Sequence, residues 1–388
     1  MRGHRRPGLA LGALPLAGAV LLLAGSAQAY PQWQFSSGAG RCNQCHYAPA
    51  GGGLLTGFGR DANGEELSTW NGEGAFLHGA VEPPPWLTLG FDARGAVLYH
   101  DAGDTDGGQP AVFPMQADLG ARASLPASLS LAVTVGARGQ TRISGNQLGS
   151  DNYQPASATR FISQEHYLMW RPQAVGPYAR AGRFFAPYGL RLAEHTVYAE
   201  RGVGLDLFEE TYNLSGGWVA ADWETHVTAF APDFVRRMGG TESGGAAMYE
   251  RRWRDMLAAG AQVRAGFKEG SQRYSGGGFG KLYLERAKTM LSAEVDVLRT
   301  VVDIAPAETG VMSYGGFTVF PVRGLLLSLY GERDQTSVKR ADSAVDALDL
   351  QINWFPYPHF ELMAFGRLQR ASGHEPMKTA LFVLHYFL

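Results

Sequence analysis

Two cysteines and a histidine form the motif in this sequence with the most specific chemistry. Cys42-Asn43-Gln44-Cys45-His46 has the pattern C-x-x-C-H, which is typical of c-type haem attachment. At this spacing each thiol can add to one haem vinyl group, and the adjacent histidine becomes an axial ligand of the iron. The motif uses both cysteines of the chain. The sequence therefore predicts one covalent haem c, held by Cys42, Cys45 and His46.

A C-x-x-C pair also occurs in redox sites, in small disulfides and in zinc sites. A redox pair usually lies in a thioredoxin-like βαβ unit, and no such unit is visible in this sequence. A zinc site needs four ligands, and the chain has no second cysteine pair. We therefore favour haem attachment over these alternatives.

The second axial position of the iron has several candidates. Segment 30–85 contains no methionine, and His78 is its only histidine besides His46. His78 could fold over to the iron, giving a lower reduction potential than a Met/His pair, or it could be a solvated loop residue. Met115 and His100 are weaker candidates, because both fall within or beside the first predicted pair of strands.

The stretch after the motif is rich in glycine. Gly51-Gly52-Gly53, Gly57 and Gly59 lack the Cβ atom that would keep the backbone away from a flat ligand. Arg60 follows directly and could pair with a haem propionate. A plain flexible loop is the other interpretation of these glycines. At this length segment 30–85 would be marginal as an independent domain, and a covalent cofactor could stabilise it.

Haem attachment of this kind takes place outside the cytoplasm, and the start of the chain predicts export. Residues 1–29 combine a basic start, an apolar run and the small-x-small site Ala27-Gln28-Ala29, as in a signal peptide that is removed. A retained membrane anchor is the alternative. No later stretch approaches the roughly 20 apolar residues of a spanning helix, so any membrane span must consist of β-strands.

The composition is compatible with many exposed strands. The chain is 45% hydrophobic and 11% aromatic, with a formal net charge of −2. The aromatic content and low net charge exclude a disordered chain, and a pI near 6.6 gives no support for nucleic-acid binding. We see no nucleotide-binding glycine motif and no Ser-His-Asp pattern. An enzyme such as a haem peroxidase would need an open iron position and a distal acid–base group, neither of which we can identify, so we do not expect an enzyme.

From residue 86 onward apolar and polar residues alternate between frequent turn signals. In 348–354 the even positions are apolar and the odd positions are Asp349, Gln351 and Asn353. A β-sandwich would also alternate. The number of strands and the charged minor face instead favour a transmembrane antiparallel β-barrel that is apolar outside and polar inside. Lumen-facing candidates are Arg138, Arg183, Arg264, Arg367, Glu294, Asp296, Asp349 and Glu361.

We count about sixteen strands, with fourteen as the alternative. They are expected near 86–100, 112–125, 127–142, 159–171, 175–186, 210–220, 222–231, 246–253, 255–267, 277–286, 288–300, 312–321, 323–333, 345–356, 358–370 and 377–388. Short links such as Pro356-Tyr357-Pro358 would be periplasmic turns. The longer polar links 101–111, 143–158, 187–209, 232–245 and 334–344 would lie on the outer face. The apolar, aromatic end 381–388 suits a last strand that pairs with the first, although many soluble β-proteins also end in a strand.

Two stretches resemble known families. Residues 181–190 (AGRFFAPYGL) resemble a strand and loop entry of porin-like outer-membrane proteins. Residues 42–60 are similar to a short monohaem segment fused to such barrels in some exported bacterial proteins. The resemblance implies an exported leader (1–29), a monohaem c-type cytochrome segment (30–85) and an outer-membrane barrel (86–388). The predicted protein is also similar in concept to the porin–cytochrome conduits that move electrons across outer membranes. Those conduits pair a larger barrel with a multihaem cytochrome, whereas this chain has one C-x-x-C-H.

Two functions follow as expectations. In the first, the barrel lies in bacterial outer-membrane lipid, with the haem segment at its periplasmic side or within its mouth, and exchanges electrons with periplasmic or multihaem cytochromes. One haem is much smaller than the roughly 30 Å hydrocarbon core, so it cannot carry electrons across alone. In the second, the chain is a solute or ion porin whose haem segment is a plug, a sensor or a structural staple.

Overall fold

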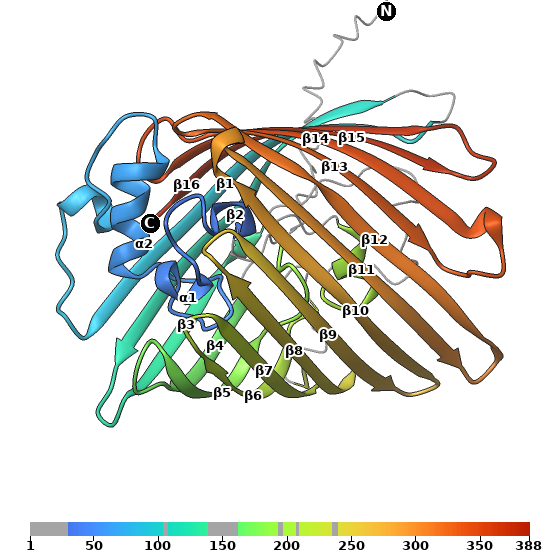
Figure 1. Ribbon diagram of the computed structural model, residues 1–388, viewed down its shortest axis with the longest axis horizontal. Coiled ribbons are helices and arrows are strands. Elements are labelled where there is room, and N and C mark those ends of the chain that lie inside the picture. The colour runs from blue at the N-terminus through green and yellow to red at the C-terminus, as the bar shows by residue number, and fades with distance from the viewer. Residues whose placement is uncertain (1–29, 104–107, 139–161, 193–196, 207–208, 235–239) are drawn as a thin grey trace, which may run out of the picture.

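The computed structural model describes residues 30–103, 108–138, 162–192, 197–206, 209–234 and 240–388. These residues form a closed barrel of antiparallel strands, in which each strand pairs with its sequence neighbours and β1 pairs with β16 (Figure 1). The predicted all-β barrel of sixteen strands is thereby confirmed. The predicted leader at 1–29 lies outside the described residues. Within them, no helix combines the length and apolar character needed to cross a membrane.

The strands are β1 (Leu87–Asp101), β2 (Gln109–Ser124), β3 (Leu129–Arg138), β4 (Ile162–Trp170), β5 (Gly176–Phe184), β6 (Thr211–Val219), β7 (Trp223–Ala231), β8 (Ser243–Trp253), β9 (Leu257–Lys268), β10 (Ser271–Leu284), β11 (Thr289–Val302), β12 (Ala305–Val322), β13 (Leu325–Gln335), β14 (Ala344–Trp354), β15 (Phe360–Ala371) and β16 (Met377–Phe387). The helices are α1 (Cys42–Cys45), α2 (Gly57–Ala62), α3 (Tyr198–Gly202) and the short turns η1 (Pro31–Trp33), η2 (Asn63–Leu67), η3 (Phe76–Gly79), η4 (Glu285–Ala287) and η5 (Ala341–Ser343).

Side chains sort onto two faces of the wall as the alternation predicts. On β14, Leu348 and Leu350 are 51% and 55% exposed on the outer face, whereas Asp349 and Gln351 are buried inside. The outside of the barrel is therefore an apolar surface around a polar lumen, as in membrane-spanning barrels. The other predicted inward residues are buried as well, namely Arg183, Arg264, Arg367, Glu294, Asp296 and Glu361. The side chain of Arg138 lies outside the described residues.

Two links at the outer end of the barrel are shorter than predicted. β9 and β10 are joined by residues 269–270, and β11 and β12 by residues 303–304. Gly270 has a φ of +71°, which glycine adopts readily, so the turn is tight and pairing resumes at once with Ser271 opposite Lys268. Three glycines at 276–278 break the apolar pattern of β10, so the sequence predicts a start at 277, whereas the strand begins at Ser271.

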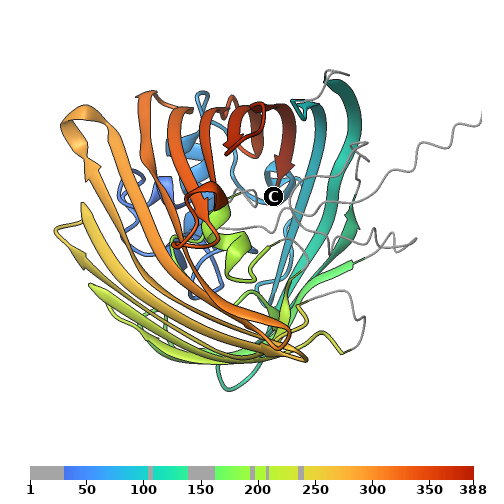
Figure 2. The same ribbon diagram turned by 90° about the vertical axis from the view of Figure 1, so that its right-hand side faces the viewer.

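One link that we expected on the outer face instead folds into the lumen. Residues 185–192 and 197–206, hereafter the inner loop, carry α3 into the barrel interior (Figure 2). Its Leu190, Leu192, Val197 and Ala199 pack against four inward residues of the wall, Met248, Phe279, Tyr314 and Tyr330. The apolar side chains of this loop are the reason for the difference, because burying them stabilises the inward fold.

Segment 30–85 enters the barrel from the end with the short turns. The backbone N–H of Thr69 donates to the carbonyl of Phe355 (2.8 Å), and that of Trp70 donates to Pro356 (2.9 Å). Gly324, at a φ of +80°, lies so close to Thr69 that a Cβ atom would collide with it. The segment is therefore attached to the turns, and its remainder reaches into the lumen, where Gln32 donates to Tyr330 (3.0 Å).

Candidate functional site

The C-x-x-C-H motif forms a single, tightly held helical turn. The backbone N–H of His46 donates to the carbonyl of Cys42 (3.0 Å), and that of Thr56 donates to Cys45 (2.8 Å). Gly59, on α2, contacts the carbonyl of Cys45 so closely that any Cβ atom would collide with it. The loop after the motif therefore folds back over α1, which fixes the two thiols and the imidazole on one short piece of chain.

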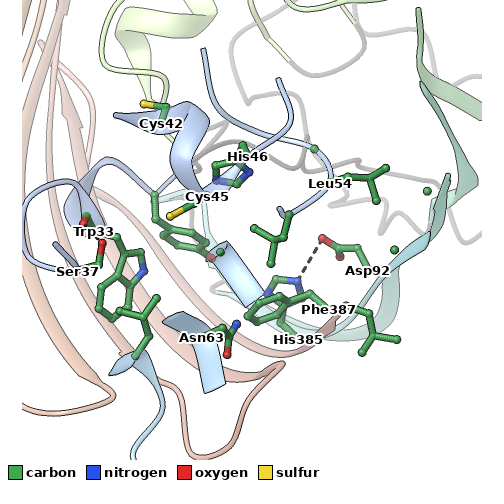
Figure 3. Close-up of a pocket in the computed structure, with 18 of the residues that line it drawn as sticks. Trp33, Ser37, Cys42, Cys45, His46, Leu54, Asn63, Asp92, His385 and Phe387 are labelled. Carbon is green, nitrogen blue, oxygen red and sulfur yellow. Dashed lines mark hydrogen bonds and ion pairs between the residues drawn. The ribbon is translucent and has the colours of Figure 1, made fainter. Parts of the chain in front are cut away.

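A cavity of about 1310 Å³, counting the part that opens to solvent, lies between this turn and the barrel wall. Cys45 and His46 lie on one side of it, and His385 and Phe387 of β16 lie on the other (Figure 3). Its apolar lining comes from both the segment and the wall, and includes Trp33, Leu54, Leu55, Leu67, Phe91, Phe355 and Phe387. A mostly apolar concave site with few polar groups is typical of cofactor binding.

Burial controls the protonation of the motif. It raises the pKa of Cys45 to about 11 and also raises the pKa of Cys42, because the interior disfavours a thiolate. A redox-active cysteine reacts as the thiolate, so these shifts disfavour that alternative. Burial lowers the pKa of His46 to about 4, and hydrogen bonding to the backbone of Gly53 and Gly52 offsets part of this. His46 is therefore neutral at pH 7, the form that binds metals.

The donor set fits a c-type haem. Both cysteines are free thiols, and His46 Nδ1 is buried without a hydrogen-bond partner among the described residues. In the same part of the chain, no group of three or more His, Cys, Asp or Glu residues is arranged to hold a metal ion. The motif thus lies beside a cavity that could receive the flat ligand its chemistry predicts.

The structure does not bring the predicted distal ligand to this cavity. His78 lies outside it, with Nδ1 3.2 Å from the carbonyl of Glu73 and Nε2 3.4 Å from the hydroxyl of Tyr386. The weaker candidates are elsewhere too. Met115 packs in an apolar cluster with Phe113, and His100 lies 3.0 Å from the hydroxyl of Thr379.

Of the residues after the motif that we predicted to contact the haem, some line the cavity and others do not. Arg60 is not among the lining residues: its guanidinium donates to the carbonyl of Leu89 and lies 5.8 Å from the centre of the Phe76 ring. Gly53 and Gly59 do line the cavity. Gly51 and Gly52 instead line a neighbouring cavity that faces the inner loop.

Three basic residues that line the cavity are absent from the site predicted from the sequence. Arg41 precedes the motif directly, and Arg94 and His385 are on β1 and β16. Strand parity could have found His385, since it is 4% exposed and its neighbour Leu384 is 51% exposed. The apolar residues of β16 predict barrel closure, and His385 is the one histidine among them.

A buried ionic cluster connects the motif, the inner loop and the wall. Arg191 of the inner loop donates to Cys42 Sγ (3.4 Å) and to Glu224 (3.2 Å). Glu250 of β8 accepts from Gln34 of segment 30–85 (3.1 Å) and from Lys281 of β10 (2.6 Å). Segment 30–85 and the inner loop therefore share one set of partners on the wall.

Comparisons with known proteins establish the fold. No family model matches the chain, and no curated protein matches it. Among solved structures, OprB of Pseudomonas putida superposes with a TM-score of 0.59 at 9% identity, over 78% of this chain and 94% of that one. A loop-deletion form of OmpT, an outer membrane protein of Vibrio cholerae, gives 0.55 at 12% identity, over 78% and 100%. An anion-selective porin from Comamonas acidovorans gives 0.55 at 13% identity, over 78% and 99%. The barrel of this chain thus has the fold of outer-membrane porins.

Proposed function

We propose that this chain is an outer-membrane barrel that carries one covalent haem c and takes part in electron transfer with partner cytochromes. The observation that carries the proposal is the position of the C-x-x-C-H turn, which lies inside the barrel beside a cavity lined mainly by apolar side chains. The apolar outer face and the porin fold support a location in the outer membrane.

Each motif residue has a distinct role in this proposal. Cys42 and Cys45 tether the haem through thioether bonds, and His46 ligates the iron. The apolar walls keep water from the cofactor, and Arg41 and Arg94 are the arginines among the lining residues that could pair with propionates, although Arg94 already pairs with Asp92. When bound, a c-type haem supplies a one-electron ferric–ferrous couple whose potential depends on its axial ligands and its burial.

The position of the segment determines what partners are needed. It is attached to the short turns, which in outer-membrane barrels face the periplasm. A periplasmic cytochrome could therefore exchange electrons with the site at this end. The hydrocarbon core is roughly 30 Å thick, so transfer to the outer face needs a further carrier, such as a multihaem protein.

The proposal is tested on protein purified from membranes of a host that attaches haem c. We expect a pyridine haemochrome spectrum of haem c with one haem per chain, and haem that stays on the chain in a denaturing gel. The double variant Cys42→Ser, Cys45→Ser should show no haem on the chain in the denaturing gel. Ser36→Ala, which leaves the motif intact, should keep its haem. Haem-free wild-type protein with two reactive thiols would refute the proposal.

The second candidate function is a porin whose segment 30–85 is a plug. It is favoured by the porin fold and by the way this segment and the inner loop occupy the lumen. Planar-bilayer conductance separates the two functions. Ionic conductance without electron exchange with cytochromes favours the porin, and electron exchange in liposomes with little conductance favours the electron-transfer barrel.

A further inference from the structure

We infer that His385 of β16 is the second axial ligand of the haem iron; the inference rests on the proposed function. His385 lines the same cavity as His46 and lies across it from the motif (Figure 3). Among the described lining residues there is no methionine and no other imidazole besides His46. Tyr30 could ligate iron through its hydroxyl, but that hydroxyl already donates to Glu361 (2.9 Å).

One ring nitrogen of His385 has the kind of partner that metal-binding histidines have. Its Nδ1 lies 2.6 Å from Glu361 Oε2. An ionised carboxylate can only accept, so Nδ1 carries a proton, and Nε2 is the nitrogen left for another partner. Histidine ligands of metals commonly donate their other N–H to a carboxylate, which fixes the tautomer and the ring orientation.

Glu361 is itself held in place by groups from two directions. Asn353 of β14 donates to its Oε1 (2.6 Å), and Tyr30 of segment 30–85 donates to its Oε2 (2.9 Å). Both oxygens therefore have donors besides His385, and the carboxylate is fixed between the wall and the segment. The carboxylate thus anchors one side of the imidazole, as the supporting contacts of a metal site do.

The other nitrogen, Nε2, faces Asp92 (Figure 3). It is buried and lies 3.3 Å from Asp92 Oδ2, in an ion-pair contact that lacks the geometry of a hydrogen bond. Asp92 does not depend on this contact, since Arg94 donates to it (3.3 Å) and Gln116 donates to it as well. His385 can thus turn Nε2 to another partner without leaving a buried carboxylate unpaired.

Ligation by His385 has a consequence for the barrel. His46 belongs to segment 30–85 and His385 to the strand that closes the ring with β1. An iron held by both would connect the segment to the wall at the closing seam. Two imidazoles would also give a lower potential than a Met/His pair, which suits a donor to low-potential partners.

The test compares histidine variants of the full-length haem-loaded protein by absorption and electron paramagnetic resonance spectroscopy. Wild-type protein should be low-spin. His385→Ala should become high-spin or bind cyanide rapidly, and added imidazole should restore the low-spin spectrum. His78→Ala and the exposed His374→Ala should leave the spectrum unchanged. His385→Met, which keeps a ligand in place if the alanine variant does not fold, should remain low-spin with a raised potential.

The outcomes separate this inference from the proposed function. Protein that never contains haem refutes the proposed function. Protein with one haem per chain whose low-spin spectrum survives His385→Ala, or is lost in His78→Ala instead, overturns the assignment of His385 alone. A high-spin wild-type spectrum overturns it too, because it shows an iron without a second strong ligand.

Discussion

Replacing Glu250 by glutamine removes one of two carboxylates from the buried ionic cluster. In the wild type three cations, Arg191, Arg252 and Lys281, surround Glu224 and Glu250. All five side chains are largely or fully buried. The substitution keeps the shape of the residue but leaves three cations around a single carboxylate. We expect it to weaken the attachment of segment 30–85 to the lumen.

The magnitude follows from the burial. Removing one partner of a buried ion pair costs about 3–5 kcal/mol, because the remaining charges are uncompensated. When segment 30–85 leaves the lumen, water can enter and hydrate those charges, so the cost falls on the docked state. At about 1.4 kcal/mol per factor of ten, the population of the undocked state should rise roughly a hundredfold to a few thousandfold.

Limited proteolysis of the purified protein in detergent measures this population when docking is fast relative to cleavage. Glu250→Gln should accelerate cleavage within 30–85 by the same factor, while the exposed Glu285→Gln should not. Adding Lys281→Met to Glu250→Gln restores the original excess of one positive charge and should recover part of the loss, a coupling of about 0.5–3 kcal/mol. Cleavage within about threefold of wild type for Glu250→Gln, or strictly additive effects in the double variant, would refute the reasoning.

Three further predictions concern the turns and the outer face. Burial lowers the pKa of His359, in the β14–β15 turn, to about 4, so the stability that depends on neutral His359 is present above pH 6.5 and is lost as the pH falls toward 4. The loss of folding free energy is at most about 3 kcal/mol. In His359→Phe, the release of segment 30–85, measured by limited proteolysis, should depend less steeply on acidification. Gly324→Val should cost more than about 1 kcal/mol, because of its positive φ and its contact with Thr69; unchanged proteolysis of the segment would contradict this. Leu350→Arg should destabilise the barrel in lipid vesicles by about 2–4 kcal/mol in denaturant unfolding, and an unaltered midpoint would show that this face does not contact lipid.

The wall could be predicted from the sequence because alternation and turn chemistry act locally. For example, the strand predicted near 246–253 corresponds to β8 (Ser243–Trp253) of the barrel. The inner loop could not be placed in this way. A link of that length is compatible with either side of the barrel mouth, and only its contacts with inward wall residues such as Met248 determine its direction.

The candidate site also has one part that local sequence predicts and one part that depends on the tertiary fold. Cys42, Cys45 and His46 are adjacent in sequence, so their spacing alone predicts a shared site. His385 is 339 positions from His46 in the chain, and it reaches the same cavity only because β16 closes against β1. Proximity along the sequence favoured His78, but η3 leaves that residue outside the cavity, beside the turn that carries His359.

The closed ring of strands has a consequence for the biogenesis of the protein. β1 and β16 pair from Asp92 with Phe387 to Asp101 with Lys378, and the motif lies inside the ring that this pairing completes. Both thiols line a cavity between the segment and the wall, so an enzyme that attaches the cofactor could reach them most easily before the segment docks. Under the proposed function, we therefore expect cofactor attachment to precede membrane insertion. A chain that reached the outer membrane unmodified would hold its thiols in the lumen, where they become accessible only while segment 30–85 is undocked.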